Sequence, residues 1–194
     1  MKALGICGSP RSKGNTYRLV KAALEPIEAA GVETELVELA DLDIRPCRAC
    51  LECKGKEYCQ QDDDFNPVFD KMKAAEAILL GSPVHFGSAT ANLISLLDRA
   101  GYVDRVNKHN FFVRKVGGPI VVARRAGQNF TFAQLNYFFL INEMIVPGST
   151  YWNVAFGCEK GEVHSDAEGL DTVKTLAQNM AWLLRKLHAG AEEK

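Results

Sequence analysis

The sequence predicts an α/β fold, a doubly wound parallel sheet with helices on both faces, and three observations support this prediction. Five short apolar runs of strand type alternate with stretches whose apolar residues recur at helical spacing. The chain has 194 residues, 47% of them hydrophobic, which is enough for one substantial core. No repeat, low-complexity stretch or linker interrupts this pattern. We therefore expect a single domain over residues 1–190.

The first half of the chain contains three of the expected strands and three helices. We expect the strands at residues 2–6, 34–39 and 77–81, and the helices at 15–30, 66–75 and 90–100. Pro26 lies inside the first helical pattern, so a kink or an early end is expected there. Residues 40–64 form an irregular, cysteine-rich insertion after the second strand, and a loop of this length is usually functional.

The second half continues the alternation. We expect a strand at residues 119–123, an aromatic-rich helix at 131–143, a fifth strand from Met144 toward Val154, and a helix at 167–188. Pro119 is expected near the start of its strand, because proline has no N–H to donate inside a central strand. Residues 101–115 are polar and show no clear period, so they receive no assignment.

Three unusual turns follow the first, third and fourth expected strands, at residues 8–16, 82–88 and 124–129. In a doubly wound sheet the ligand binds beyond the carboxyl ends of the strands, where the strand order reverses. All three turns lie at that edge of a parallel sheet. One ligand bound there would explain the polar and glycine-rich character of all three.

The turn at residues 8–16 has the composition of an anion site. It joins a strand to a helix, so free backbone N–H groups and the positive end of the helix dipole meet there. The patterns G-x-x-x-x-G-K-[ST] and G-x-G-x-x-G are both absent. The hydroxyl-rich composition favours a phosphomonoester held mainly by neutral donors, as in flavin mononucleotide sites. The alternative is an ordinary turn whose Ser and Asn side chains only cap the helix.

Charge and hydropathy exclude several classes of partner. A net charge of -1 gives no reason to expect a nucleic acid or a membrane surface as partner. The apolar runs are too short to span a bilayer, and the first residues lead into a strand rather than a signal peptide. We therefore expect a soluble, cytoplasmic protein.

Four of the six cysteines crowd together as Cys47-x2-Cys50-x2-Cys53-x5-Cys59. Without a secretory signal, clustered cysteines indicate metal ligands rather than disulfides. The triple C-x2-C-x2-C spacing favours a [4Fe-4S] cluster, because three sulfurs of one loop can reach three irons and Cys59 can fold back as the fourth ligand. A structural zinc and a metal-free segment remain the alternatives.

The residues around this segment receive simpler assignments. Asp62, Asp63 and Asp64 are expected to form the N-cap and first turn of the following helix. Cys7 and Cys158 are expected to be buried or partly buried thiols without a ligand role.

The ordered combination of motifs resembles the flavodoxin-like, FMN-dependent NAD(P)H reductase family over nearly the whole chain. The matching segments are Gly8-Ser9-Pro10-Arg11 through Asn15-Thr16, Gly81-Ser82-Pro83-Val84 through Phe86-Gly87, and Met144-Ile145-Val146-Pro147-Gly148 before Tyr151-Trp152. With the cysteine segment included, the chain is most similar to the iron-sulfur flavoproteins of that family. The resemblance implies the flavodoxin-like strand order 2-1-3-4-5, with FMN and a [4Fe-4S] cluster as cofactors.

The resemblance also implies which residues bind FMN. The phosphate would be held by Ser9, Arg11, Ser12, Gly14, Asn15 and Thr16. The isoalloxazine ring would lie along Pro83, Val84, His85, Phe86 and Gly87. The turn that carries Arg124, Arg125, Gly127 and Gln128 would close the other side of the ring.

One residue and one pair of residues depart from the family pattern. His85 stands where the family often has a phenol, and Arg124-Arg125 replaces a turn that is often richer in glycine. Ring packing and redox tuning are therefore expected to differ. One of the two arginines near the N1 edge would stabilise the anionic reduced flavin. His85 equally fits a capping or exposed histidine without a redox role.

Two enzymatic functions follow from these assignments. In the first, FMN and the cluster exchange electrons, with ferredoxin or NAD(P)H as donor and a small molecule, a quinone or an oxygen species, as acceptor. In the second, the protein is an FMN-dependent NAD(P)H:quinone or flavin reductase whose cysteine segment holds zinc or no metal. A non-redox binding module is the third class. Neither enzymatic function requires a proton-transfer residue.

Aromatic residues near the fourth turn predict self-association as a homodimer or homotetramer. Five of them lie within ten residues: Phe130, Phe132, Tyr137, Phe138 and Phe139. Aromatic side chains are enriched at protein interfaces. The alternative is that all five are core residues.

Overall fold

The computed structural model describes residues 1–189 and shows one five-stranded sheet with the order β2-β1-β3-β4-β5. The strands are β1 (Lys2–Cys7), β2 (Glu33–Glu38), β3 (Ala77–Pro83), β4 (Val116–Ala123) and β5 (Val154–Phe156). Every neighbouring pair is parallel. The flavodoxin-like doubly wound fold and its strand order are thereby confirmed. The expected domain end at residue 190 lies outside the described residues.

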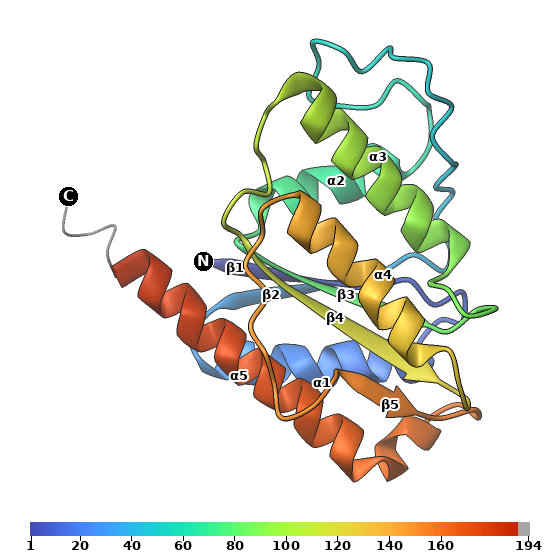
Figure 1. Ribbon diagram of the computed structural model, residues 1–194, viewed down its shortest axis with the longest axis vertical. Helices are drawn as coiled ribbons and strands as arrows, with labels where there is room; N and C mark the ends of the chain where they lie inside the picture. Colours follow the sequence, from blue (N-terminus) through green and yellow to red (C-terminus); the bar gives the residue numbers. More distant parts are fainter. Residues whose placement is uncertain (190–194) are drawn as a thin grey trace.

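Helices cover both faces of the sheet, as Figure 1 shows. One face carries α2 (Phe65–Ala74), α3 (Ala91–Asn107) and α4 (Gln128–Ile141), and the other carries α1 (Asn15–Ala29) and α5 (Ala167–Ala189). A short 3-10 helix, Glu162–Ser165, precedes α5. Each face has its own hydrophobic core, because neighbouring residues of a strand point to opposite faces. Leu4 and Ile6 of β1 belong to one core, and Ala3 belongs to the other.

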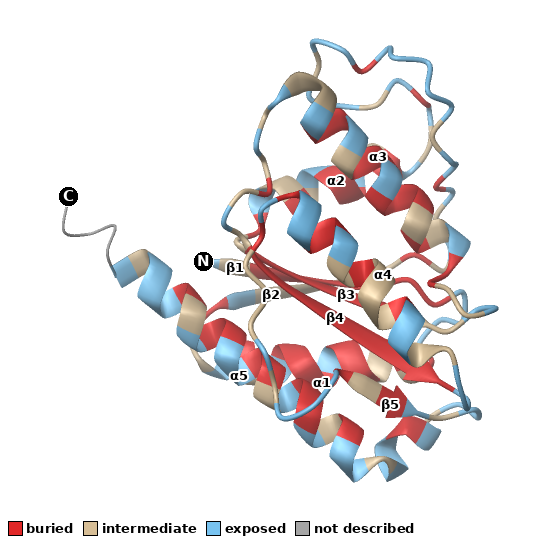
Figure 2. Cartoon of the chain, viewed as in Figure 1, coloured by how far each residue is buried: buried red, intermediate tan, exposed pale blue. Residues whose placement is uncertain are grey.

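The central strands are buried and the long loops are not, as Figure 2 shows. All eight residues of β4 are buried. Residues 39–64, between β2 and α2, contain no helix or strand, and most of the cysteine-rich loop is exposed or half-buried. Among the described residues, no helix is both long and apolar enough to cross a bilayer.

One helix prediction was wrong in its bounds, and one expected early end is absent. α3 runs on past residue 100 to Asn107 and therefore takes in half of the unassigned segment 101–115. Buried Val103 extends the apolar face of α3, and Lys108, with φ of 53°, ends the helix in the left-handed conformation. Pro26 does not stop α1, which continues to Ala29. Proline lacks only its own N–H, so a single hydrogen bond of the helix is lost at this position.

Pro119 lies in the middle of β4, not near its start as predicted. The N–H groups of Gly117 and Val121 donate to Ile145 and Asn153 at 2.9 Å each, so the nitrogen of Pro119, between them, faces the same side. The predicted fifth strand is interrupted on that side: Ile145 forms only an isolated bridge, and β5 starts at Val154. No strand pairs with β4 beside Pro119 on that side, so the missing N–H of Pro119 costs the sheet no hydrogen bond.

Candidate functional site

A cavity lies at the carboxyl ends of β1, β3 and β4, where the sequence predicts a ligand. Eight predicted cofactor residues line it: Ser9, Arg11, Asn15, Thr16, Pro83, Val84, His85 and Arg124. Pro10, Val122, Gly157 and Cys158 complete the wall. Seven predicted residues do not line it: Ser12, Gly14, Phe86, Gly87, Arg125, Gly127 and Gln128. The sheet edge thus brings the three predicted turns together, although not every residue of them.

The loop after β1 exposes backbone donors to this cavity. Ser9 is buried, and its Oγ accepts a hydrogen bond from the Arg11 N–H at 3.1 Å. α1 begins at Asn15 with Gly14 as its N-cap, and no side chain caps it. The first N–H groups of a helix have no partner within the helix, so they remain available to an anion together with the positive end of the helix dipole. The alternative that Ser and Asn side chains cap this helix is therefore wrong.

Two side chains of this loop are engaged elsewhere. The Ser12 hydroxyl donates to Glu38 at 3.4 Å, and the Lys13 N–H donates to the other oxygen of Glu38 at 2.7 Å. The amide of Asn15 donates to the Glu159 carbonyl at 2.8 Å and accepts from the Gly161 N–H at 2.7 Å. Asn15 therefore fastens the loop after β5 against the cavity.

Gly157 and Cys158, which line the cavity, belong to that loop and were not predicted. The relevant signal is their position just after Phe156, the last residue of β5. The predicted fifth strand begins at Met144, too early in the sequence, so the residues after Phe156 were not recognised as a turn at the sheet edge. Cys158 is exposed, so the prediction that it is a buried or partly buried thiol was wrong. The prediction for Cys7 is confirmed, because Cys7 is buried and this burial raises the pKa of its thiol to about 12.

The turn after β3 is tight, and its tip points away from the cavity. His85 and Ser88 exchange two backbone hydrogen bonds of 2.8 and 3.0 Å. Phe86 and Gly87 between them have φ of 50° and 78°, the arrangement of a two-residue hairpin turn. The Phe86 side chain is fully exposed at 109% of its reference area. Pro83, Val84 and His85 are therefore the residues of this turn that line the cavity.

The turn after β4 closes against this hairpin turn. Gly127 has φ of 86°, and a Cβ atom added to it would lie 2.8 Å from the Val84 Cγ1 atom. Glycine is therefore required on both conformational and steric grounds. Arg124 lines the cavity, whereas Gln128 lines a neighbouring cavity together with Tyr151 and Trp152.

All four clustered cysteines line a second cavity, between their loop and α3. Ala49 and Leu51 have φ of 51° and 62°, and these two left-handed residues turn the chain between the cysteines. The Ala49 N–H donates to the Cys47 Sγ at 3.4 Å. Within residues 1–189, no group of three or more His, Cys, Asp and Glu side chains is arranged to hold a metal ion. The sulfurs thus surround a common cavity without converging on one point.

A buried ion pair lies against the cysteine cavity and was not predicted. The side chains of Arg99 and Asp63 are 1% and 0% exposed and are joined at 2.5 Å. Burial lowers the pKa of Arg99, but the hydrogen bonds to the Asp63 carboxylate outweigh this effect, and the net pKa is raised. Burial works in the opposite sense on Asp63, where hydrogen bonds from Arg99 and from backbone N–H groups bring a net lowering of its pKa. An arginine on the apolar face of a helix is the sequence signal that could have revealed this pair.

The acidic triplet is only partly as predicted. α2 begins at Phe65, and Asp63 accepts the Phe65 N–H at 3.2 Å. Asp64, the N-cap residue, accepts the Asp43 N–H at 2.8 Å instead of capping the helix with its side chain. Asp63 and Asp64 thereby bind residues 43–45 of the loop to the start of α2.

Comparison with known proteins places the chain in a family. Residues 1–159 match the family described as NADPH-dependent FMN reductase. An iron-sulfur flavoprotein of Methanocaldococcus jannaschii is 40% identical over 193 residues, covering 95% of this chain and 98% of the relative. An iron-sulfur flavoprotein of Methanosarcina thermophila is 32% identical over 197 residues, covering 100% of both chains.

Solved structures agree with this fold. RosB with a bound 8-demethyl-8-formylriboflavin-5'-phosphate intermediate has a TM-score of 0.77 and 19% identity, covering 100% of this chain and 88% of RosB. A WrbA-like flavodoxin of Agrobacterium tumefaciens has a TM-score of 0.66 and 15% identity, covering 95% of this chain and 97% of the other. The chain therefore belongs to the NADPH-dependent FMN reductase family, is similar throughout to its iron-sulfur flavoproteins, and is an FMN-dependent oxidoreductase.

Proposed function

We propose that this protein passes electrons between a [4Fe-4S] cluster and FMN. The observation that carries the proposal is that Cys47, Cys50, Cys53 and Cys59 all line one cavity. That cavity is separate from the one at the sheet edge, since the two share no lining residue. The relatives similar over the whole length carry the name iron-sulfur flavoprotein, which supports the presence of both groups.

The residues at the sheet edge fit FMN. The uncapped start of α1 and buried Ser9 suit the phosphate, and exposed Arg11 lies on the same wall. Pro83, Val84 and His85 would lie along the ring, and Arg124 would bring positive charge to it. The seven predicted residues that do not line the cavity would contribute only through the shape of the three turns: Ser12, Gly14, Phe86, Gly87, Arg125, Gly127 and Gln128. When bound, FMN supplies both one-electron and two-electron chemistry.

The cysteine cavity fits a cluster better than it fits zinc. Four thiolates around one zinc lie about 2.3 Å from it, so their sulfurs must converge on a point. In this loop they surround a cavity and do not form a single-ion group. A cluster with irons at separate corners takes its thiolates farther apart. The N–H group of Ala49, directed at Cys47 Sγ, is of the kind that hydrogen-bonds to cluster sulfurs.

The alternative function is an FMN-dependent NAD(P)H:quinone or flavin reductase in which the cysteine segment is structural. The description of the matched family favours it, because that family is named for NADPH-dependent reduction of FMN. In this case NAD(P)H alone reduces the protein, and the cysteines are not needed for turnover. In our proposal the one-electron donor is ferredoxin-like and the acceptor is a quinone or an oxygen species.

Anaerobic stopped-flow mixing separates the two functions. We expect reduced ferredoxin to bleach the flavin absorption of the wild type faster than NAD(P)H does. Cys50 is exposed, so Cys50→Ser is the replacement that disturbs packing least. We expect this variant to keep FMN, lose iron and lose the fast reaction with ferredoxin. Equal NAD(P)H-driven rates in the wild type and the variant, with no reaction of either with ferredoxin, would establish the reductase instead.

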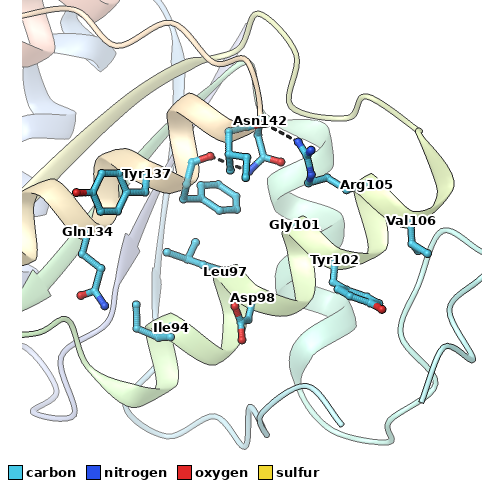
Figure 3. Close-up of a pocket in the computed structure, with 12 residues that line it drawn as sticks. Ile94, Leu97, Asp98, Gly101, Tyr102, Arg105, Val106, Gln134, Tyr137 and Asn142 are labelled. Carbon is cyan, nitrogen blue, oxygen red and sulfur yellow. Dashed lines mark hydrogen bonds between the residues drawn. The ribbon is translucent and has the colours of Figure 1, made fainter. Parts of the chain in front are cut away.

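We also propose that the single domain works in the cytoplasm as a homodimer or homotetramer. A groove between α3 and α4 supports self-association, and Figure 3 shows their side chains facing each other across it. Tyr137 and Ile141 on its wall are 65% and 56% exposed. Asp98 and Arg105 also line it, two turns apart on α3. Antiparallel pairing of two α3 helices about a two-fold axis would set each Asp98 against the other copy's Arg105.

The five aromatic residues for which interface and core were the two alternatives differ in burial. Phe138 and Phe139 are buried in the core, whereas Phe130 and Tyr137 are 64% and 65% exposed. Phe132 packs half-buried against the core. The core interpretation is therefore confirmed for Phe138 and Phe139, and Phe130 and Tyr137 are exposed residues that the proposed interface could use. The exposed members leave aromatic surface on α4, and aromatic side chains are enriched at protein interfaces.

A further inference from the structure

Arg99 is an almost completely buried charged side chain that lines the cysteine cavity. It projects from α3 with 1% of its side chain exposed. Its two terminal nitrogens donate to both oxygens of Asp63, at 2.5 and 3.0 Å, and one of them also donates to the Arg45 carbonyl at 3.0 Å. The guanidinium carbon lies 4.1 Å from the centroid of the Phe65 ring, which covers one face. The guanidinium is therefore held in one orientation.

One donor of this guanidinium has no partner. The Nε atom of Arg99 is buried and makes no hydrogen bond within the described residues. A buried donor without a hydrogen bond is costly to the folded state, so such an atom indicates a missing partner. The Arg99 side chain lines the same cavity as the four cysteines. The missing partner is therefore expected in that cavity.

The chemistry of the cavity identifies the partner. Sulfur atoms of an iron-sulfur cluster accept hydrogen bonds, and these bonds, together with local charge and burial, set the reduction potential. Building on the cluster proposed above, we propose that the Nε–H of Arg99 donates to sulfur atoms of the cluster in this cavity and raises the reduction potential of the cluster. Asp63 fixes this donor and also neutralises the charge of Arg99.

This arrangement predicts opposite shifts for two substitutions. Reduction adds negative charge to the cluster, so a nearby donor and cation favour the reduced form. Asp63→Asn leaves the Arg99 charge uncompensated and should raise the midpoint potential. The double change Asp63→Asn with Arg99→Met removes the donor and the pair together and should lower it. A residue that only holds the loop in place would not give shifts of opposite sign.

The experiment is a redox titration of anaerobically purified protein, monitored by electron paramagnetic resonance of the reduced cluster. At the wild-type midpoint we expect the reduced-to-oxidised ratio of the double variant to fall about tenfold, which is about 59 mV for one electron. Arg99→Lys keeps the charge without the Nε–H, so its midpoint potential should lie between those of the wild type and the double variant. Lys54→Gln is the matched control, because Lys54 is exposed in the same loop and does not line the cavity. Its midpoint should stay at the wild-type value.

The outcomes separate this inference from the function on which it rests. Iron, sulfide and FMN contents are measured for every variant, with circular dichroism as a check on the fold. Full clusters with unchanged midpoints in all Arg99 and Asp63 variants would overturn the role of Arg99 and leave the proposed function standing. Loss of the cluster from Arg99→Lys with the fold kept would also overturn it, because Arg99 would then act only in assembly. Wild-type protein that binds FMN but no iron would remove the proposed function itself.

Discussion

At the scale of single residues, the stability of the cysteine loop depends on the buried pair of Asp63 and Arg99. Asp63 accepts hydrogen bonds from Arg99, from the Arg45 N–H and from the Phe65 N–H. It therefore joins α3, the cysteine loop and the start of α2 at one buried point. Removing one partner of such a pair leaves an uncompensated charge, whereas removing both does not.

Arg99→Met should therefore destabilise the metal-free protein more than the double change with Asp63→Asn does. We expect the single variant to lose about 3–5 kcal/mol of unfolding free energy. Urea unfolding measured under reducing conditions, with a chelator present, gives the comparison. A single variant within about 1 kcal/mol of the wild type would show that the pair adds little to stability.

Lys115 gives a signed prediction for pH. Burial lowers the pKa of its amine from 10.5 to about 8, and the amine donates to the Met72 carbonyl at 3.1 Å. Between pH 8 and 10.5 the unfolded chain holds a proton that the folded chain does not. The contribution of Lys115 to the unfolding free energy should therefore rise with pH in this window, by about 1 kcal/mol after allowance for partial exposure.

The measurement for Lys115 is the unfolding free energy of the wild type and of Lys115→Met at pH 8 and pH 10. Comparing the two proteins cancels the titration of the remaining groups. The difference, wild type minus variant, should increase with pH. A difference that is flat or falls would mean that the Lys115 amine is charged in the folded protein throughout this window.

Gly127 tests the proposed flavin cavity. Gly127→Ala should weaken FMN binding at least about tenfold, because the added methyl meets Val84 and must distort the cavity wall. Gly31→Ala is the matched control: Gly31 has nearly the same φ, 85° against 86°, but nothing lies within 4 Å of its added Cβ. Quenching of free FMN fluorescence measures both affinities. Equal affinities would mean that the Val84–Gly127 contact does not shape the FMN site.

At the residue scale, the sequence allowed the prediction of site residues that lie close together along the chain. The four cysteines lie close together in sequence and line one cavity, and Ser9 and Thr16 of the first loop line the other. Arg99 and Asp63 are 36 residues apart, so their pairing depends on where α3 crosses the cysteine loop. Gly157 and Cys158 depend in the same way on where β5 ends. Local composition carries no information of that kind.

At the scale of elements, the strands were predictable because buried parallel strands are continuous apolar runs. β3 and β4 are longer than expected only because their ends continue into turns or glycines. α3 was cut short because its second half is amphipathic in a polar segment, with Val103 buried and Arg105 exposed. β5 was misplaced because Ile145 and Val154 both pair with β4, and the intervening loop carries apolar residues.

The groove between α3 and α4 supports an element-scale prediction about assembly. Tyr137→Glu should place an uncompensated charge on the proposed interface and convert the oligomer to a monomer, a loss of at least about tenfold in association. Trp182→Glu is the matched control, because Trp182 is 55% exposed on α5, on the other side of the sheet. Sedimentation velocity of both variants and of the wild type measures the state. If only the Trp182 change dissociates the oligomer, the interface lies on α5 and the proposed groove between α3 and α4 is not used.

At the scale of the whole molecule, one fold contains two chemically different cavities, one at the sheet edge and one between the cysteine loop and α3. The carboxyl ends of the strands form the polar, uncapped edge that suits FMN. The loop after β2 carries the cysteines above α3, where Arg99 and Asp63 bind the loop to the helical layer. The fold explains why both cavities occur in one chain: a loop at the edge of a doubly wound sheet can grow without disturbing the core.

The central claim is that this one chain carries both a flavin and an iron-sulfur cluster. The most direct test is anaerobic purification followed by an absorption spectrum and by analysis of FMN, iron, sulfide and zinc per chain. We predict flavin bands over a broad brown shoulder, with one FMN, about four irons and about four sulfides per chain, and no zinc. Flavin bands alone with stoichiometric zinc, persisting after reconstitution with iron and sulfide, would contradict it.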